Sequence, residues 1–366
     1  MRVKYSYLEE QFANPDPILA SIRELVLSTD FTLGTPLTEF EGRFAEKMGV
    51  AHAIGVNSGT DAIMLPLKAL GIGPGDEVIT MASTFVASVG AIVACGATPV
   101  FVDCTEHLTI DVAAVEKAIT PKTKAILPVH WAGHPADVPQ ILEIANKHDL
   151  VVVEDSCQAI SGEVDGKLTG TMGDAGAFSL HPLKNLNVWG DGGIIITNSD
   201  ELAAKLRLIR NHGLASRDVV ECWGYNSRLD TLQACVGNHL IDQFEFITNR
   251  RIENAARLDA GLASISQIRI PEREANKRYV YHLYIVEAED RDGLLAHLHA
   301  AEIEAKIHYP QPLHLQPAAK SLGYKVGDFP VCEAQAKRIV TLPAHQHLSD
   351  EQIDFMIAKI REFYGA

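Results

Sequence analysis

The stretch from Val151 to Asn198 reads VVVEDSCQAISG at 151–162, GDAGAFSLHPLKNLNVWGDGG at 173–193 and IIITN at 194–198. Its opening apolar run, which ends in two acids, is typical of a buried parallel strand with Asp155 at the carboxyl end. A second short strand is expected over Ala175–Ser179, followed by Lys184 in a polar turn. Open α/β sheets bind ligands at the carboxyl ends of their strands, so Asp155 and Lys184 can face each other across one ligand.

A carboxylate and a lysine in this arrangement indicate pyridoxal phosphate chemistry. That cofactor is an electron sink, which is bound through a lysine and whose ring nitrogen takes an acidic partner. The acid keeps the nitrogen protonated, and the lysine is first a nucleophile toward the aldehyde and then a base that moves a proton. Asp155 and Lys184 fit these two roles, so we predict that they are the catalytic residues and that pyridoxal 5'-phosphate is the cofactor.

Four segments carry a resemblance to a known family: NSGTDAIM at 57–64, EDSCQA at 154–159, FSLHPLKNLNVWGDGG at 178–193 and GYNSRLDTLQA at 224–234. Together they resemble the DegT/DnrJ/StrS family of sugar aminotransferases, and the match to this family covers nearly the whole chain in the right order. The resemblance implies a fold-type-I pyridoxal-phosphate enzyme that aminates a keto sugar, usually a nucleotide-linked one.

The remaining pattern predicts an α/β protein with two domains, since 366 residues exceed what one compact core accommodates. Strand, small polar turn and helix alternate, which favours a mostly parallel sheet flanked by crossover helices. The strands of this repeat are expected at Ala53–Val56, Val78–Met81, Pro99–Val102, Ala125–Val129 and Val151–Glu154. We expect a large cofactor-binding domain with an N-terminal helical segment over residues 1–250, and a smaller C-terminal α+β domain over residues 251–366.

Composition is that of a soluble globular protein, with 47% hydrophobic and 22% charged residues. A net charge of −15 disfavours nucleic acid and anionic membranes as partners, because their phosphates would be repelled. The uncharged run Thr80–Val102 is long enough to raise the question of a membrane span, but its polar residues, Gly and Pro favour strand, helix and strand. Six scattered cysteines and a start without a signal-peptide core lead us to expect a cytoplasmic protein with free thiols.

The tripeptide Ser58-Gly59-Thr60 is a candidate phosphate site between an expected strand and an expected helix. Backbone N–H groups and the helix dipole favour an anion there, and glycine allows close approach. An ordinary helix N-cap is the alternative, but the lysine and aspartate motifs favour phosphate. Ser179 could supply a hydroxyl group to the same phosphate, and in the resembled family both positions bind it.

Other cofactor contacts are implied by the resemblance. The family places an aromatic residue at Phe85 flat against the pyridine ring, although an aromatic there is usually part of the core. Gln158 matches a glutamine near the cofactor's 3-hydroxyl oxygen, and otherwise could cap the turn. Asn226 matches an asparagine that reaches the cofactor phosphate of the other subunit, which implies a homodimer with shared active sites; otherwise it is a loop or cap residue.

Substrate contacts are expected from His308, Tyr309 and His314, which resemble the family segment that lines the sugar site. The two histidines could also suggest a metal, but no Asp, Glu or Cys completes a ligand set, so we expect none. His181 could tune Lys184 or merely fill the turn. Gly71, Gly73 and Gly75 form G-x-G-x-G after a helix, which disfavours a dinucleotide fold.

These residues together predict a ping-pong transfer of an amino group from an amino acid to a keto sugar. By resemblance the donor is L-glutamate, and NSRLDTLQA (226–234) with IHYPQPLH (307–314) is closer to the 3-keto than to the 4-keto branch. A transaminase of a non-nucleotide sugar or a cyclitol is an alternative. A sugar dehydratase of the family would carry histidine in place of Lys184, and a non-catalytic sensor would lose Lys184 or Asp155.

Overall fold

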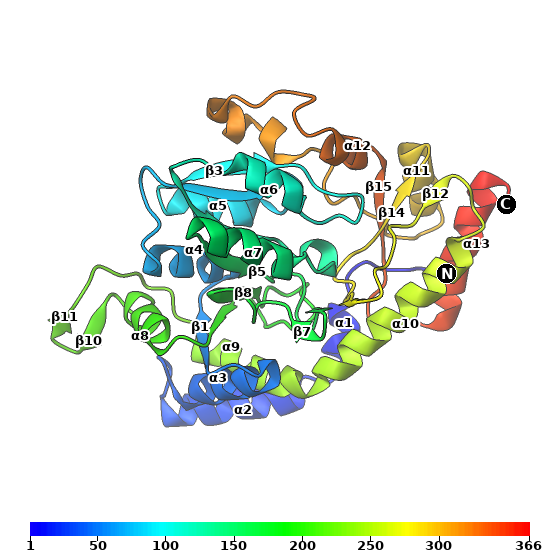
Figure 1. Ribbon diagram of the computed structural model, residues 1–366. Coiled ribbons are helices and arrows are strands. Elements are labelled where there is room, and N and C mark those ends of the chain that lie inside the picture. The colour runs from blue at the N-terminus through cyan, green and yellow to red at the C-terminus, as the bar shows by residue number, and fades with distance from the viewer.

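The computed structural model describes residues 1–366 and shows an α/β protein built on a seven-stranded sheet (Figure 1). The strand order is β1-β9-β8-β5-β4-β2-β3, and only β9 runs against its neighbours. Its strands are β1 (His52–Val56), β2 (Glu77–Met81), β3 (Thr98–Val102), β4 (Thr123–Ile126), β5 (Val151–Asp155), β8 (Ala175–Ser179) and β9 (Gly193–Thr197). The expected mostly parallel sheet is confirmed.

Helices cover both faces of this sheet (Figure 1). Consecutive residues of a strand point to opposite faces, so Val153 packs into one core and Val152 into another. The helices around the sheet are α2 (Asp16–Ser28), α3 (Thr35–Met48), α4 (Gly59–Ala69), α5 (Val86–Ala94), α6 (Val112–Ala118), α7 (Val138–His148), α8 (Asp200–Ile209) and α9 (Thr231–Leu240).

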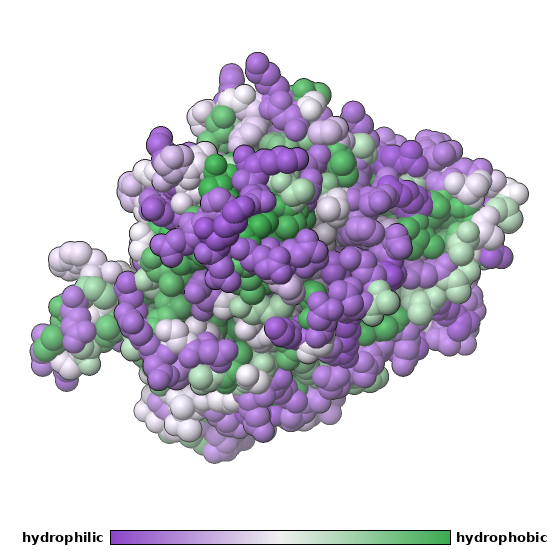
Figure 2. Space-filling view, in the orientation of Figure 1, coloured by the Kyte–Doolittle hydropathy of each residue, from purple (hydrophilic) through white to green (hydrophobic).

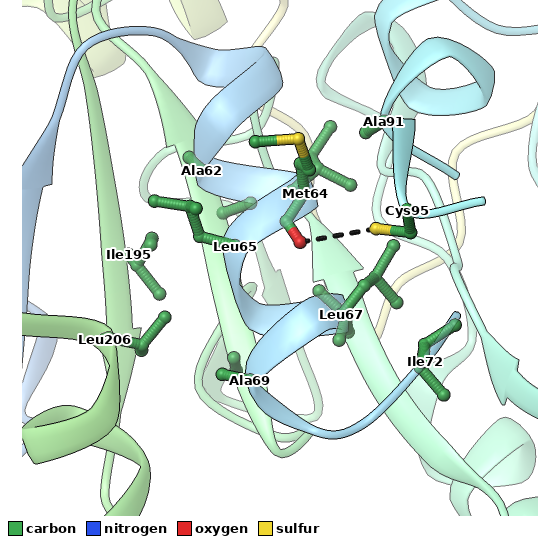
Figure 3. Close-up of a cluster of buried hydrophobic side chains, with 14 of the residues drawn as sticks. Ala62, Met64, Leu65, Leu67, Ala69, Ile72, Ala91, Cys95, Ile195 and Leu206 are labelled. Atoms are coloured by element: carbon green, nitrogen blue, oxygen red, sulfur yellow. Dashed lines mark hydrogen bonds between the residues drawn. The ribbon is translucent and has the colours of Figure 1, made fainter. Parts of the chain in front are cut away.

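Helix α4 is largely buried. Figure 3 shows Leu65 and Leu67 of α4 among apolar side chains from the sheet and from α5 and α8. The thiol of Cys95, just after α5, lies 3.5 Å from the carbonyl oxygen of Met64. Because α4 is enclosed on several sides, its first turn is held firmly against the sheet.

The uncharged run Thr80–Val102 forms the end of β2, helix α5 and strand β3, as expected from its sequence. None of the helices in the structure has both the length and the apolar character needed to span a membrane.

A second, antiparallel sheet lies in the C-terminal part of the chain. It consists of β12 (Ile268–Arg269), β14 (Tyr284–Ala288) and β15 (Ile339–Leu342), and α10 (Phe244–Leu262), α11 (Arg291–Ala300), α12 (Pro330–Arg338) and α13 (Asp350–Tyr364) accompany it. Val3 pairs with Ile303 and is buried in this C-terminal core. Helix α10 crosses residue 250 without a break, and we keep 1–250 and 251–366 as a proposed division into domains.

The remaining elements are short. A small sheet joins β6 (Glu163–Val164), β7 (Lys167–Leu168) and β13 (Lys277–Arg278). A hairpin of β10 (Leu214–Ser216) and β11 (Val219–Val220) projects at the left of Figures 1 and 2, with apolar residues on its surface. Short helical turns are α1 (Leu8–Gln11) and the 3₁₀ segments Trp131–Gly133, Ile241–Gln243, Leu313–Leu315 and Pro317–Leu322.

Replacing Leu65 by Ala should lower the free energy of unfolding by roughly 2–5 kcal/mol, because the lost methyl groups leave a cavity in a fully enclosed core. Urea unfolding followed by circular dichroism measures this. Leu27→Ala on the exposed face of α2 is the control, with an expected change of at most about 0.5 kcal/mol. Equal losses in the two variants would contradict the assigned role of α4 in the core.

Candidate active site

A cavity of about 440 Å³ lies at the carboxyl ends of the parallel strands. Five of the segments that line it follow directly from β1, β2, β4, β5 and β8, and loops from the C-terminal part of the chain complete the wall. The predicted residues that line this cavity are Ser58, Gly59, Thr60, Phe85, Asp155, Gln158, Ser179, His181, Lys184, His308 and Tyr309. The structure therefore brings most of the predicted site residues together.

Asp155 is buried at the end of β5, and its carboxylate is held by two hydrogen bonds. The hydroxyl group of Ser88 donates to Oδ2 at 2.7 Å, and the backbone N–H of Cys157 donates to Oδ1 at 3.1 Å. The peptide N–H of Asp155 donates to the carbonyl of Pro128 at 2.9 Å. These contacts leave lone pairs on both carboxylate oxygens for a cationic partner in the cavity.

Lys184 lies in a turn that is anchored through its backbone. Its carbonyl accepts hydrogen bonds from the Tyr7 hydroxyl at 2.8 Å and from Asn187 Nδ2 at 3.1 Å. Burial lowers the pKa of the Lys184 amine, and the acidic groups of Cys157 and Asp155 oppose that shift. An amine whose pKa is lowered is more often uncharged and is therefore a better nucleophile and base near neutral pH.

The first turn of α4 forms a close-packed rim of the cavity. Ser58 is the N-cap, and its hydroxyl accepts the N–H of Asp61 at 3.1 Å, while the first N–H groups of any helix lack partners within the helix. A Cβ atom on Gly59 would lie 2.6 Å from Cβ of Ser179, so only glycine fits there. This rim can accept a phosphate from the helix N-terminus and the Ser179 hydroxyl together.

An aromatic and histidine wall faces that rim. The rings of Phe85 and Tyr309 lie 5.9 Å apart, and Phe85 is 46% exposed, which is not expected of a core aromatic. Burial raises the pKa of Tyr309 to about 12 and lowers the pKa of His308 to about 4. Both His308 and Tyr309 are therefore neutral near neutral pH. His308 Nδ1 is 3.0 Å from the hydroxyl oxygen of Thr341.

The remaining predicted side chains that line the cavity are those of His181 and Gln158. The pKa of His181 is lowered by desolvation and by the charge of Lys184. Gln158 is buried, and its Oε1 accepts the backbone N–H of Ala132 at 2.7 Å, which leaves its amide NH₂ group to face the cavity.

Two predicted residues lie outside the cavity. Asn226 is exposed, next to the β10–β11 hairpin, and does not reach the cavity of its own chain. His314 is buried elsewhere: its Nε2 is 3.1 Å from Glu333 Oε1, and its ring packs edge-on against Phe329 at 4.7 Å. The prediction of a substrate contact for His314 is therefore wrong in this structure, because the turn over Leu313–Leu315 directs it into the core.

Ten further residues line the cavity without having been predicted, and those with ionisable side chains are Tyr5, Cys157, Asp191 and His282. Cys157 and Asp191 belong to the motifs already discussed, so the sequence held a signal for them. Tyr5 reaches the cavity only because the N-terminal segment pairs with Ile303, and it stacks on His308 at 5.7 Å. His282 follows a tyrosine-rich run that offered no local signal of a ligand.

Comparison with known proteins agrees with this geometry. Residues 15–361 match the DegT/DnrJ/EryC1/StrS aminotransferase family. The chain belongs to this family. That result confirms the expected family, its fold-type-I architecture and its enzymatic class.

Individual relatives extend the match over the full length. The pleiotropic regulatory protein of Geobacillus stearothermophilus is 43% identical, over 100% of this chain and 99% of its own length. The dTDP-3-amino-3,4,6-trideoxy-alpha-D-glucose transaminase of Streptomyces venezuelae is 42% identical, over 97% of this chain and 93% of its own length. The crystal structure of DesV from S. venezuelae, in complex with a ketimine intermediate, is 41% identical with a TM-score of 0.97, over 100% and 99% of the two chains.

This chain, as a member of the family, is an aminotransferase that uses pyridoxal phosphate. A family structure has been solved with the amino form of that cofactor, pyridoxamine phosphate, bound. The cavity fits that cofactor. A buried carboxylate faces it from β5, a lysine with no carboxylate partner enters it from the other side, and the glycine rim at α4 leaves room that a side chain would fill.

Gly59→Ala should weaken binding of pyridoxal phosphate about tenfold to a hundredfold, because the added Cβ displaces Ser179 and loosens the hydrogen bonds expected at the phosphate. Titration of the apoprotein, followed by absorbance, measures the dissociation constant. Gly42→Ala in α3 is the matched control, since its added Cβ meets nothing within 4 Å. An unchanged affinity in Gly59→Ala would place the phosphate elsewhere.

Proposed function

We propose that this aminotransferase moves the amino group of L-glutamate to a nucleotide-linked 3-keto sugar by a ping-pong mechanism. The supporting observation is that one cavity gathers Lys184, Asp155 and the N-terminus of α4. A 42% identical relative is named as a transaminase of a dTDP-linked 3-amino sugar, which supports the choice of sugar class and of carbon. The segments Asn226–Ala234 and Ile307–His314 favour the same branch of the family.

In this proposal Asp155 and Phe85 hold the cofactor ring. Bound pyridoxal phosphate supplies an aldehyde that accepts amino groups and a ring that withdraws electrons. Asp155, fixed by Ser88 and the Cys157 N–H, holds a proton on the ring nitrogen and stabilises the charge that develops during reaction. Phe85 would lie against one face of the ring, and Gln158 would donate to the ring's hydroxyl oxygen.

Lys184 carries out the proton transfers. With the cofactor bound, its amine would remove the proton from the α-carbon of the amino acid and would return a proton at the neighbouring carbon of the cofactor. Its lowered pKa leaves more of the uncharged form that such a base requires. Ser58, Gly59, Thr60 and Ser179 bind the phosphate, so the cofactor stays in place while amino donor and keto acceptor exchange.

Both substrates use the same cavity in turn. The wall of His181, His308 and Tyr309 presents neutral donors and acceptors that suit the hydroxyl groups of a sugar. One binding site for two successive substrates predicts parallel lines in double-reciprocal plots of rate, as ping-pong kinetics require.

Changing Lys184 to Ala should abolish turnover and the imine absorbance of the bound cofactor, since no other amine lines the cavity. Absorbance spectra with and without L-glutamate, together with an assay on a panel of keto sugars, measure both effects. Lys167→Ala, at an exposed position of strand β7, should behave like the parent protein. Normal activity in Lys184→Ala would refute the assignment of Lys184.

The active enzyme in this proposal is a homodimer in which Asn226 of one chain binds the cofactor phosphate of the other. Asn226 is exposed in its own chain, the adjoining hairpin exposes Val219 and Val220, and Trp223 after the hairpin is 93% exposed. Apolar groups so exposed favour a partner surface. We also propose a cytoplasmic location, which suits the six free cysteines.

Mixing two inactive variants tests the shared site. Lys184→Ala and Asn226→Ala, each inactive or weakly active alone, should regain up to about a quarter of parental sites after dissociation and reassociation, because half of the dimers are mixed and each has one intact site. Activity of the mixture against each variant alone measures this. No recovery, with mixed dimers demonstrated by native mass spectrometry, would place Asn226 in the site of its own chain or outside both.

A further inference from the structure

His282 lies between the active-site cavity and a second, much smaller cavity of about 20 Å³. It borders both, and its imidazole makes no hydrogen bond with the chain. Nδ1 is buried and without a partner. Since the ring also borders the active-site cavity, its opposite edge, with Nε2, faces the substrate side.

Three buried polar atoms without a partner in the chain belong to residues that border the small cavity: Arg251 Nη2, His282 Nδ1 and His345 Nδ1. They come from α10, from the segment before β14 and from the loop after β15. Buried polar groups are almost always hydrogen-bonded, and a cavity of this size holds one water molecule. A single occupant can therefore satisfy all three atoms.

The donor pattern selects water as that occupant. His345 Nε2 is 3.1 Å from the carbonyl oxygen of Lys4, which only accepts, so Nε2 carries the proton and Nδ1 is an acceptor. Arg251 donates through Nε to Gln346 and through Nη1 to the Tyr281 carbonyl, and its Nη2 still offers hydrogens. Water accepts from Arg251 and donates to both imidazoles, whereas a chloride ion has no hydrogen to give them.

This hydrogen-bond pattern accommodates the tautomer of His282 in which Nδ1 is the acceptor. Burial lowers the pKa of His282 well below its usual value, so the ring is neutral and carries one proton. With Nδ1 accepting from the water, that proton is on Nε2. The chain from the Arg251 guanidinium through water to the imidazole also polarises the ring, which strengthens Nε2–H as a donor.

We propose that His282 binds the α-carboxylate of the amino-acid substrate through Nε2–H, and that a buried water shared with Arg251 and His345 holds it in this tautomer. This inference rests on the proposed function, because it assumes that an amino acid enters the cavity that holds Lys184.

Electrostatics and reach favour a carboxylate at this position. After burial, the two cations Lys184 and Arg251 act most strongly on His282. An anionic oxygen is therefore favoured on this side of the cavity. The α-carboxylate is attached to the carbon that loses its proton to Lys184, so it has to lie close to that lysine. The phosphate of a nucleotide sugar is several bonds farther from its reacting carbon.

Three variants test the contact in the holoenzyme. His282→Phe removes the donor and should raise the dissociation constant of L-glutamate about tenfold to a hundredfold, with the KM of the keto sugar nearly unchanged. His282→Gln, whose amide nitrogen lies near the position of Nε2, should recover part of the affinity. His297→Gln on α11 is the control histidine outside the cavity. Single-turnover absorbance with each substrate separates the two half-reactions.

A second measurement does not depend on activity. In the parent holoenzyme labelled with ¹⁵N-histidine, NMR should show His282 with a protonated Nε2 and an unprotonated Nδ1, assigned by loss of the signals in His282→Gln. Arg251→Met should remove the donor to the water and alter this tautomer pattern. A proton on Nδ1 of His282 in the parent protein would overturn the inference.

The outcomes separate this inference from the proposed function. Unchanged glutamate binding in His282→Phe, with the cofactor band intact, would overturn the carboxylate contact alone. A selective rise in the KM of the keto sugar would also overturn it and would assign His282 to the sugar or its phosphate. Absence of cofactor absorbance in the parent protein would instead refute the proposed function.

Discussion

The close contact between the first turn of α4 and the ends of β8 and β9 is the constraint on which the site depends. A Cβ on Gly59 would collide with Ser179, and a Cβ on Gly193 would lie 2.2 Å from the carbonyl oxygen of Ser58. Two glycines therefore let a helix N-terminus meet two strands at backbone distance. The apolar face of α4 holds that contact in place from behind, so the proposed phosphate rim is preformed.

Buried polar groups hold the strand that carries Asp155. Glu154, next to Asp155, is fully buried and accepts N–H groups from Gly170, Met172 and Gly173 at 2.7–2.8 Å, while His130 Nε2 lies 3.0 Å from it. These bonds tie the loop between β5 and β8 to the strand that carries Asp155. Breaking such a network leaves a buried charge without partners, which is far more costly than losing a surface contact.

The N-terminal segment and the C-terminal part of the chain close the cavity together. Tyr5 stacks on His308, and Tyr7 donates to the carbonyl of Lys184 while its ring lies under the guanidinium of Arg251 at 5.0 Å. The cavity is therefore lined by residues that are about 300 positions apart in sequence. We infer that the water shared by Arg251, His282 and His345 belongs to this same junction. There, residues from α10, from the segment before β14 and from the loop after β15 leave polar atoms without partners in the chain.

The amino-acid sequence was enough to predict the mostly parallel sheet, the cofactor and the residues at strand ends, because alternating apolar runs and short motifs such as Ser58-Gly59-Thr60 are local signals. Tertiary structure decided what depends on long-range packing. It showed Tyr5 and His282 in the cavity and turned His314 into the core beside Glu333. A side chain's neighbours across the fold are set by how distant elements pack, and no local pattern of residues encodes that.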